Sequence, residues 1–316
     1  EHPSKLARTL GASYPQGAVP PPRPRRKGPA AAVVLAYLRE NAEKLKAMDR
    51  GVREDEPDAV HQLRVSARRM RSAIATYLKL LDRSSADHLR SELQWAANAV
   101  GEARDIEVMR QRLEDLVAAE PDDLLLGPVA QRIEEELGAR YREARTSGLA
   151  ALNDQRYFRL LDALDALLAS PPLTDAAQRK AGKATARLVS RDLKRLRTAV
   201  DAAQAARGHT GEGEALHEAR KKAKRMRYAA EAAKTVHGKR ARRLAKGAAK
   251  IQQTLGDHQD SVVTREMLRN LASTTLPEGT TAFTFGRLHA QEEQQGAADR
   301  AEFFRLWAEF QPKRLR

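Results

Sequence analysis

Apolar residues recur every three or four positions along most of the chain, the spacing that places them on one face of a helix. The pattern begins near Pro29, and no sustained alternation of Val, Ile and Thr predicts a strand. Segments that contain Pro or Gly separate the periodic stretches. Helices are expected at 30–50, 58–82, 85–119, 122–148, 155–169, 174–206, 214–235, 238–271 and 281–310. The sequence therefore predicts an all-α protein.

Two blocks of this pattern occur twice. Residues 61–71 (HQLRVSARRMR) match residues 217–227 (HEARKKAKRMR), and the Gly-x-x-x-Asp element at 101–105 matches the one at 256–260 at nearly the same offset. We therefore expect two similar helical repeats, 29–172 and 173–316. About four helices in each repeat predict a pair of four-helix bundles related by an approximate twofold axis.

Residues 1–28 lack the helical pattern. The run Pro20–Pro24 cannot continue a helix and favours an extended backbone. This segment is predicted to be a poorly ordered Pro/Arg-rich linker.

The duplicated block carries the candidate chemistry. On a helix that turns 100° per residue, Arg64, Arg68 and Arg71 fall within 80° of His61, while Leu63 and other apolar residues fall on the opposite face. Residues 61–81 contain no Asp or Glu, so like charges crowd one helix face. The second copy presents the same cationic face, and we expect an anion to relieve the crowding.

Further basic faces follow in the second half of the chain. With 57 Lys and Arg against 42 Asp and Glu, the net charge is +15, which predicts a polyanionic partner. Arg offers bidentate recognition of phosphate, and the basic faces carry almost no aromatic residues for stacking on bases. The residues expected to bind the polyanion are His61, Arg64, Arg68, Arg71, Lys183, Arg187, Arg191, Lys194, His217, Arg220, Lys221, Lys224, Arg227, Lys246 and Lys250.

Composition excludes several classes of function. The chain has no cysteine, so disulfides, cysteine zinc sites and thiol nucleophiles are absent, and a reducing, cytoplasmic setting is expected. No histidine pair has metal-ligand spacing, so neither a metal nor a cofactor is predicted. No apolar run is long enough to span a bilayer, and no secretory signal is recognised, so no membrane partner is predicted. We expect a binding protein and no enzyme.

The duplicated motifs also resemble the CHAD family, named for a conserved-histidine α-helical domain, over roughly residues 29–316. The resemblance implies binding of inorganic polyphosphate along a basic central groove or channel, and association with polyphosphate granules. It carries over to His61, Arg64, Arg68, Arg71, His217, Arg220, Lys224 and Arg227. The second copy departs at Lys224, where the first has Arg68. The opening residues 4–11 look like the end of a CYTH domain, although the Glu-x-Glu-x-Lys element of that family is absent.

Alternatives remain open at several of these residues. His61 and His217 could pack or cap their helices instead of binding anions. Asp105 and Asp260 could be a metal or acid/base pair, but we expect them to hold the Arg rows by ion pairs. A nucleic-acid backbone is the alternative partner, and a phosphohydrolase is a third interpretation.

Overall fold

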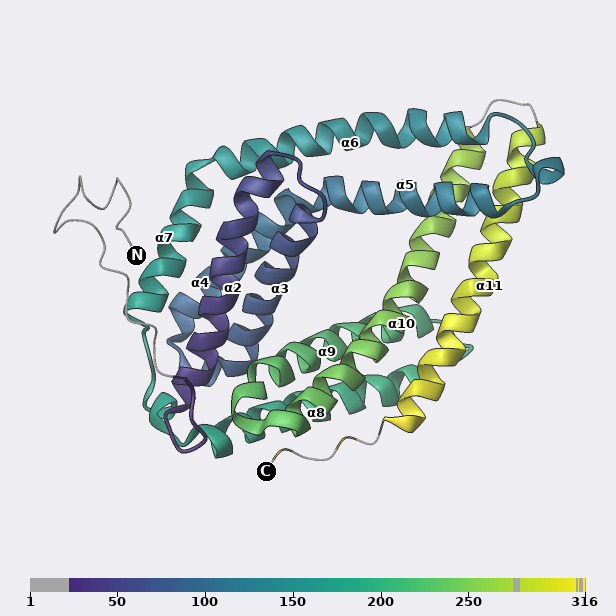
Figure 1. Cartoon of the computed structure of the whole chain (residues 1–316). Coiled ribbons are helices and arrows are strands. Elements are labelled where there is room, and N and C mark those ends of the chain that lie inside the picture. The colour runs from purple at the N-terminus through teal and green to yellow at the C-terminus, as the bar shows by residue number, and fades with distance from the viewer. Residues whose placement is uncertain (1–22, 275–278, 311, 313–314, 316) are drawn as a thin grey trace.

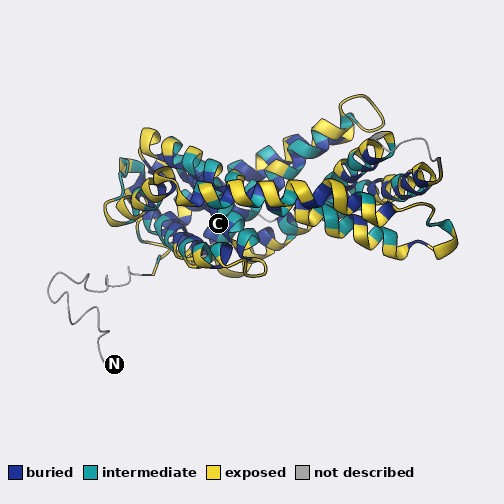
Figure 2. Ribbon diagram, turned by 90° about the horizontal axis from the view of Figure 1, so that it is seen from above, coloured by how far each residue is buried: buried dark blue, intermediate teal, exposed yellow. Residues whose placement is uncertain are grey.

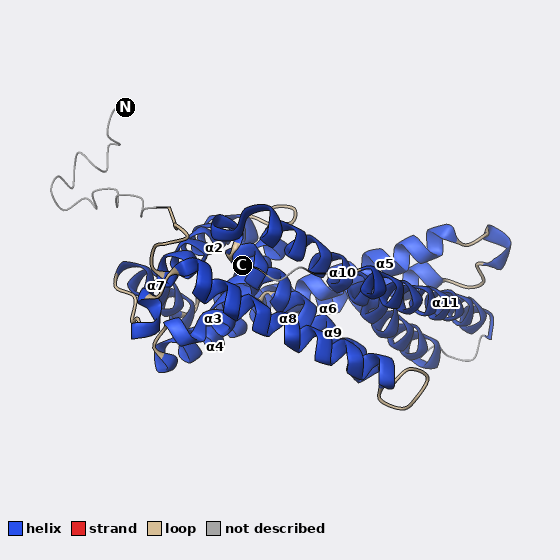
Figure 3. Ribbon diagram, turned by 90° about the horizontal axis from the view of Figure 1, so that it is seen from below, coloured by secondary structure: helices blue, strands red, loops and turns tan. Residues whose placement is uncertain are grey.

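The computed structural model describes residues 23–274, 279–310, 312 and 315, and this part is all-α, with no strand (Figure 3). Short 3₁₀ turns connect some of the helices: η2 (Leu78–Leu80), η3 (Asp122–Leu124) and η4 (Asp175–Gln178). The helices are α2 (Ala30–Arg53), α3 (Ala59–Tyr77), α4 (Arg83–Ala99), α5 (Gly101–Ala119), α6 (Val129–Asn153), α7 (Gln155–Ala169), α8 (Ala181–Ala205), α9 (Glu212–Ala232), α10 (Lys234–Thr274) and α11 (Gly279–Glu309).

Helices α2, α3, α4 and α7 enclose the first hydrophobic core (Figure 1). Leu63, Met70, Ile74 and Tyr77, the apolar face predicted for α3, are fully buried in it. The opposite face of α3 is therefore turned away from this core and carries the cationic side chains.

Helices α8 and α9 form the second core with the first part of α10 and the last part of α11. Alanine dominates here, and short side chains allow the helices to approach closely. Met226 of α9, which corresponds to Met70, is likewise completely buried. The buried residues line the inward faces of the helices, as Figure 2 shows.

A third core joins the two halves of the chain. It contains Leu113 of α5 and Ile133 of α6, together with Leu268 of α10 and Phe285 of α11. In Figure 1, α5 and α6 extend from the first group of helices to meet the far ends of α10 and α11. Each of the segments 29–172 and 173–316 therefore builds most of one core by itself. The two segments also share the third core.

Ion pairs with two buried carboxylates stabilise the third core. The carboxylate of Glu292 in α11 is 3% exposed and accepts two bonds from Arg112 of α5, at 2.9 and 2.7 Å. Glu120, at the end of α5, accepts bonds from Arg287 of α11 at 3.0 and 3.2 Å. These pairs neutralise carboxylates that would otherwise be costly to bury.

Some helix boundaries differ from the prediction. The helix expected at 85–119 is two helices, α4 and α5, which meet at Val100. The helices expected from 122 and 174 begin only at Val129 and Ala181, after 3₁₀ turns. Periodicity cannot locate such bends because the apolar spacing continues through them. The start expected at 238 agrees with a kink inside α10, where Gly238 has a non-helical φ of 53°.

The predicted linker is only partly within the described residues, since residues 1–22 lie outside them. Its last residues are attached to the start of α8. The Gly182 amide donates to the Arg26 carbonyl at 2.9 Å, and the Ala181 amide donates to the Gly28 carbonyl at 2.8 Å. These bonds satisfy free amides of the first turn of α8.

Candidate functional site

Helices α3 and α9, which carry the two copies of the His/Arg motif, meet near their C-terminal ends (Figure 1). The hydroxyl of Tyr77 donates to the carbonyl of Ala229 at 3.3 Å, and Arg225 donates to the carbonyl of Ala75 at 2.7 Å. The N-terminal halves of the two helices carry the predicted cations. The angle between α3 and α9 therefore determines which of these cations lie together.

Two acids hold the contact between α3 and α9. Asp192 of α8 is 1% exposed, accepts a bond from Thr76 at 2.6 Å and pairs with Arg225 at 3.0 Å. Glu231 of α9 pairs with Arg69 at 3.4 Å. The sequence analysis did not select Arg69 and Arg225. The one sequence feature that could have pointed to them is their equivalent position in the two copies of the motif.

Five cations from α3 and α9 form what we call the basic cluster: Arg64, Arg68, Arg71, Arg220 and Lys224. Burial lowers the pKa of Lys224 to about 8, and the charges of Arg220, Arg68, Arg64 and Arg71 add to this effect. Burial also lowers the pKa of Arg68, with contributions from Arg64 and Arg220. The cations of the two motif copies are thus close enough to affect one another electrostatically.

Most cations of the basic cluster lie outside ion-pair distance of a carboxylate that the structure describes. Within the described residues, Arg68, Arg71, Arg220 and Lys224 form no ion pair with an Asp or Glu. Arg71 donates to the amide oxygen of Gln94, which carries no charge. The site is a partly buried group of like charges, and such a group favours an anion.

Arg64 is the exception, because the Gly-x-x-x-Asp element holds it. Its guanidinium donates to both oxygens of Asp105, at 2.8 and 3.1 Å, and to the carbonyl of Gly101 at 3.1 Å. A Cβ atom on Gly101 would lie 3.1 Å from the Arg64 guanidinium, so the glycine makes room for the cation. The sequence analysis recognised this element without assigning a role to its glycine.

The second element has a related but looser geometry. A Cβ atom on Gly256 would lie 3.4 Å from the guanidinium of Arg220. Burial raises the pKa of Asp260, and the charges of Arg220 and Arg112 oppose that rise. Asp260 therefore lies near Arg220 without forming the bidentate pair that Asp105 makes.

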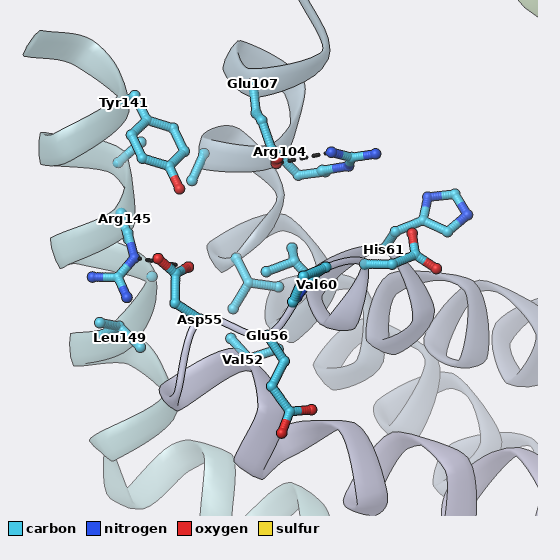
Figure 4. A pocket seen from close by; sticks show the side chains of 16 residues that line it. Val52, Asp55, Glu56, Val60, His61, Arg104, Glu107, Tyr141, Arg145 and Leu149 are labelled. Atoms are coloured by element: carbon cyan, nitrogen blue, oxygen red, sulfur yellow. Dashed lines mark hydrogen bonds and ion pairs between the residues drawn. The ribbon is translucent and has the colours of Figure 1, made fainter. Parts of the chain in front are cut away.

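The two histidines have different surroundings. His61 lines a cavity of about 250 Å³, with the Asp55–Arg145 pair on its opposite side (Figure 4). Burial lowers the pKa of His61, and Arg68 lowers it further while Asp58 opposes. His61 is thus neutral near pH 7. His217 forms a hydrogen bond through Nδ1 to Gln259 at 3.2 Å.

The other predicted residues are not gathered at the basic cluster. Arg227 donates to Glu231 at 2.9 Å, and Lys221 pairs with Glu218 at 3.4 Å. Arg191 donates to the Thr76 carbonyl at 3.2 Å, at the contact between α3 and α8. The remaining ones are exposed on α8 and α10: Lys183, Arg187, Lys194, Lys246 and Lys250.

The described residues contain no group of three or more His, Asp or Glu that could hold a metal ion. None of the helices in this part is both long enough and apolar enough to cross a bilayer.

The structure is an all-α domain in which helices α3 and α9 carry two copies of one His/Arg motif. The sequence matches the CHAD domain family over residues 36–269, and the chain belongs to that family. Two uncharacterized proteins of Mycobacterium tuberculosis, MT2285 and Rv2226, are each 38% identical over 299 residues, covering 92% of this chain and 54% of theirs. The chain thus spans about half the length of these relatives.

Solved structures share the fold. The CHAD domain from the plant Ricinus communis superposes with a TM-score of 0.72 at 25% identity, covering 92% of this chain and 96% of that one. PptA from Streptomyces chartreusis gives a TM-score of 0.73 at 24% identity, covering 89% of this chain and 99% of its own.

Proposed function

We propose that this chain is a non-catalytic module that binds inorganic polyphosphate through the basic cluster of α3 and α9. The observation that carries the proposal is that α3 and α9 pack together with Arg68 of one motif copy acting on Lys224 of the other, while neither forms an ion pair with a carboxylate among the described residues. Membership of the CHAD family supports the class of ligand.

Crowded, partly buried cations are costly for the protein. Arg68, Arg71 and Lys224 lose solvation through burial and are repelled by neighbouring cations, which lowers the pKa of each. A chain of phosphates supplies closely spaced negative charges that offset both effects. Each guanidinium of the cluster would bind two phosphate oxygens, from Arg64, Arg68 and Arg71 on α3 and from Arg220 on α9. Lys224 would act as a point charge.

The paired geometry also supports an internal duplication. Gly101 lies against Arg64 and Gly256 lies against Arg220, at equivalent positions of the two copies. We infer two related halves, each contributing one wall of a basic groove. The exposed cations of α8 and α10 would extend the electrostatic attraction without contacting the same phosphates.

The proposal extends to the complete protein. Binding to polyphosphate would bring the protein to polyphosphate granules in the cytoplasm. A CYTH domain before this module would place a triphosphatase beside the bound chain, as the resemblance of residues 4–11 suggests. The module itself would hold phosphate and not hydrolyse it.

The first test is a titration with long-chain polyphosphate near physiological salt. We expect tight binding that weakens steeply with salt, because several counterions are released. The double variant Arg68→Gln/Lys224→Gln should bind at least tenfold more weakly. Its matched control, Lys183→Gln/Lys194→Gln, removes two exposed positive charges from α8 and should bind within about threefold of the unchanged protein.

Equal losses in the two double variants would mean that affinity follows net charge, and the site assignment would be rejected. Competition tests the alternative partner, because excess RNA or DNA should fail to displace polyphosphate. Ready displacement would favour a nucleic-acid backbone as the ligand. Release of phosphate during incubation with Mg²⁺ would contradict a non-catalytic role.

A further inference from the structure

A second cavity, of about 330 Å³, opens beside the basic cluster between α5, α6 and α10. The Arg64–Asp105 pair forms its boundary with the cluster, since Arg64 acts on Lys224 and also lines this cavity. A ligand bound at the basic cluster could therefore reach directly into it.

One side of the cavity is apolar. Ile106 and Leu137 are buried beneath it, Met109 and Met267 are half-buried, and Val263 is 43% exposed. These side chains belong to the third core or cover it. A flat apolar group that covered these side chains would remove apolar surface from water, which stabilises the complex.

The rim of the cavity offers hydrogen-bond acceptors. Glu102 and Asp105 contribute carboxylates, Asn98 contributes an amide, and Arg140 contributes a guanidinium that pairs with Glu136 at 3.5 Å. Carboxylates accept bonds from hydroxyl groups and repel phosphate. The two carboxylates therefore make the rim better suited to a group that carries hydroxyls than to the continuation of a bare phosphate chain.

We infer that this cavity binds the nucleoside part of a nucleoside oligophosphate whose phosphates lie on the basic cluster. The base would cover Met109, Val263 and Met267, and the ribose hydroxyls would donate to the carboxylates of the rim. This inference rests on the proposed function, because it uses the same cluster to hold the phosphates. The protein would then bind two kinds of ligand: inorganic polyphosphate and an oligophosphate that ends in a nucleoside.

The order of groups in the protein matches the order in such a ligand. Along α5, the cavity lining begins at Gly101 beside Arg64, continues with the carboxylates of Glu102 and Asp105, and ends with Ile106 and Met109. A nucleoside oligophosphate presents phosphates, then sugar hydroxyls, then an apolar base. A volume of this size is within the range of small-molecule sites.

The test compares adenosine triphosphate with inorganic tripolyphosphate by calorimetry, on the full chain, in EDTA at fixed ionic strength. Tripolyphosphate carries at least as much negative charge, so electrostatics alone predicts that it binds at least as tightly. We expect adenosine triphosphate to bind about tenfold more tightly. The variant Val263→Asn should remove most of this advantage and leave tripolyphosphate binding within about twofold.

Val108→Asn is the matched control. Val108 lies on α5, is 43% exposed like Val263, and does not line the cavity. This variant should retain the preference for the nucleotide. Equal affinity for the two ligands, or equal effects of the two substitutions, would overturn the nucleoside site while leaving the phosphate site intact. Failure of both ligands and of long-chain polyphosphate to bind would instead reject the proposed function, and the nucleoside site with it.

Discussion

The guanidinium of Arg64 lies against Gly101, donating to its carbonyl at 3.1 Å and to the carboxylate of Asp105 at 2.8 Å. The Arg64 side chain is 18% exposed, whereas that of Asp105 is 70% exposed. The first turn of α5 therefore fixes the direction in which Arg64 points, and a side chain at position 101 would compete for the same space.

We expect Gly101→Ala to weaken polyphosphate binding by about threefold to tenfold, because the added methyl group displaces the Arg64 guanidinium. The stability of the protein should fall little, since alanine favours a helix more than glycine does. Gly256→Ala is the matched control, because its Cβ would meet Arg220 only at an ordinary contact distance of 3.4 Å. If both variants bind alike, the close fit at Gly101 has no role in binding.

Lys224 makes the stability of the ligand-free protein depend on pH. Burial lowers its pKa from the ordinary 10.5 to about 8, so between these values the unfolded chain holds a proton that the folded protein has lost. The contribution of Lys224 to stability therefore rises with pH from about 8 upward and is most unfavourable below pH 8.

The variant Lys224→Met should consequently be more stable than the unchanged protein at pH 7, by on the order of 2–3 kcal/mol, with the difference shrinking toward pH 10. Urea unfolding at several pH values measures this difference. Polyphosphate should bind the variant more weakly. A difference in stability that does not change with pH would falsify the assignment of a buried, repelled ammonium group.

Arg112 and Glu292 should prove essential for the third core. The variant Arg112→Met leaves the buried Glu292 carboxylate without its partner and should cost about 3–5 kcal/mol of unfolding free energy. Arg110→Met, two residues earlier on α5, removes a cation that is 41% exposed and should cost less than about 1 kcal/mol. Chemical denaturation measures both. The double variant Arg112→Met/Glu292→Met should recover most of the lost stability, and its failure to do so would contradict the role of the ion pair.

His61 should report the arrival of the ligand. Burial holds its pKa below the usual 6.5, and nearby arginines add to the effect. A polyanion on the basic cluster adds negative charge and should raise that pKa, so that the imidazole takes up a proton near neutral pH. An NMR titration of the His61 ring with and without polyphosphate, at matched ionic strength, measures the shift. An unchanged titration curve would show that His61 does not belong to the anion site.

The sequence predicted several properties that the structure and the comparisons confirm. The all-α class followed from the spacing of apolar residues, and the buried face of α3 is the one that the spacing selected. The CHAD resemblance followed from two short motifs and is confirmed over residues 36–269. These properties depend on residues close together in the chain, where a helix fixes the geometry.

The break between α4 and α5 at Val100 could not be predicted from the sequence. Apolar spacing continues across Val100, and the bend depends on the packing of α5 against α6, which lies outside the first core. For the same reason, the sharing of a core between α5, α6, α10 and α11 could not be predicted from two similar halves.

The sequence by itself determined which side chains share a helix face, including the cationic faces of α3 and α9. Only the tertiary structure decided that Arg68 lies close enough to Lys224 to lower its pKa, and that Arg227 pairs with Glu231. The physical reason is that a helix fixes angles between its own residues, whereas distances between helices depend on buried contacts such as Asp192–Arg225.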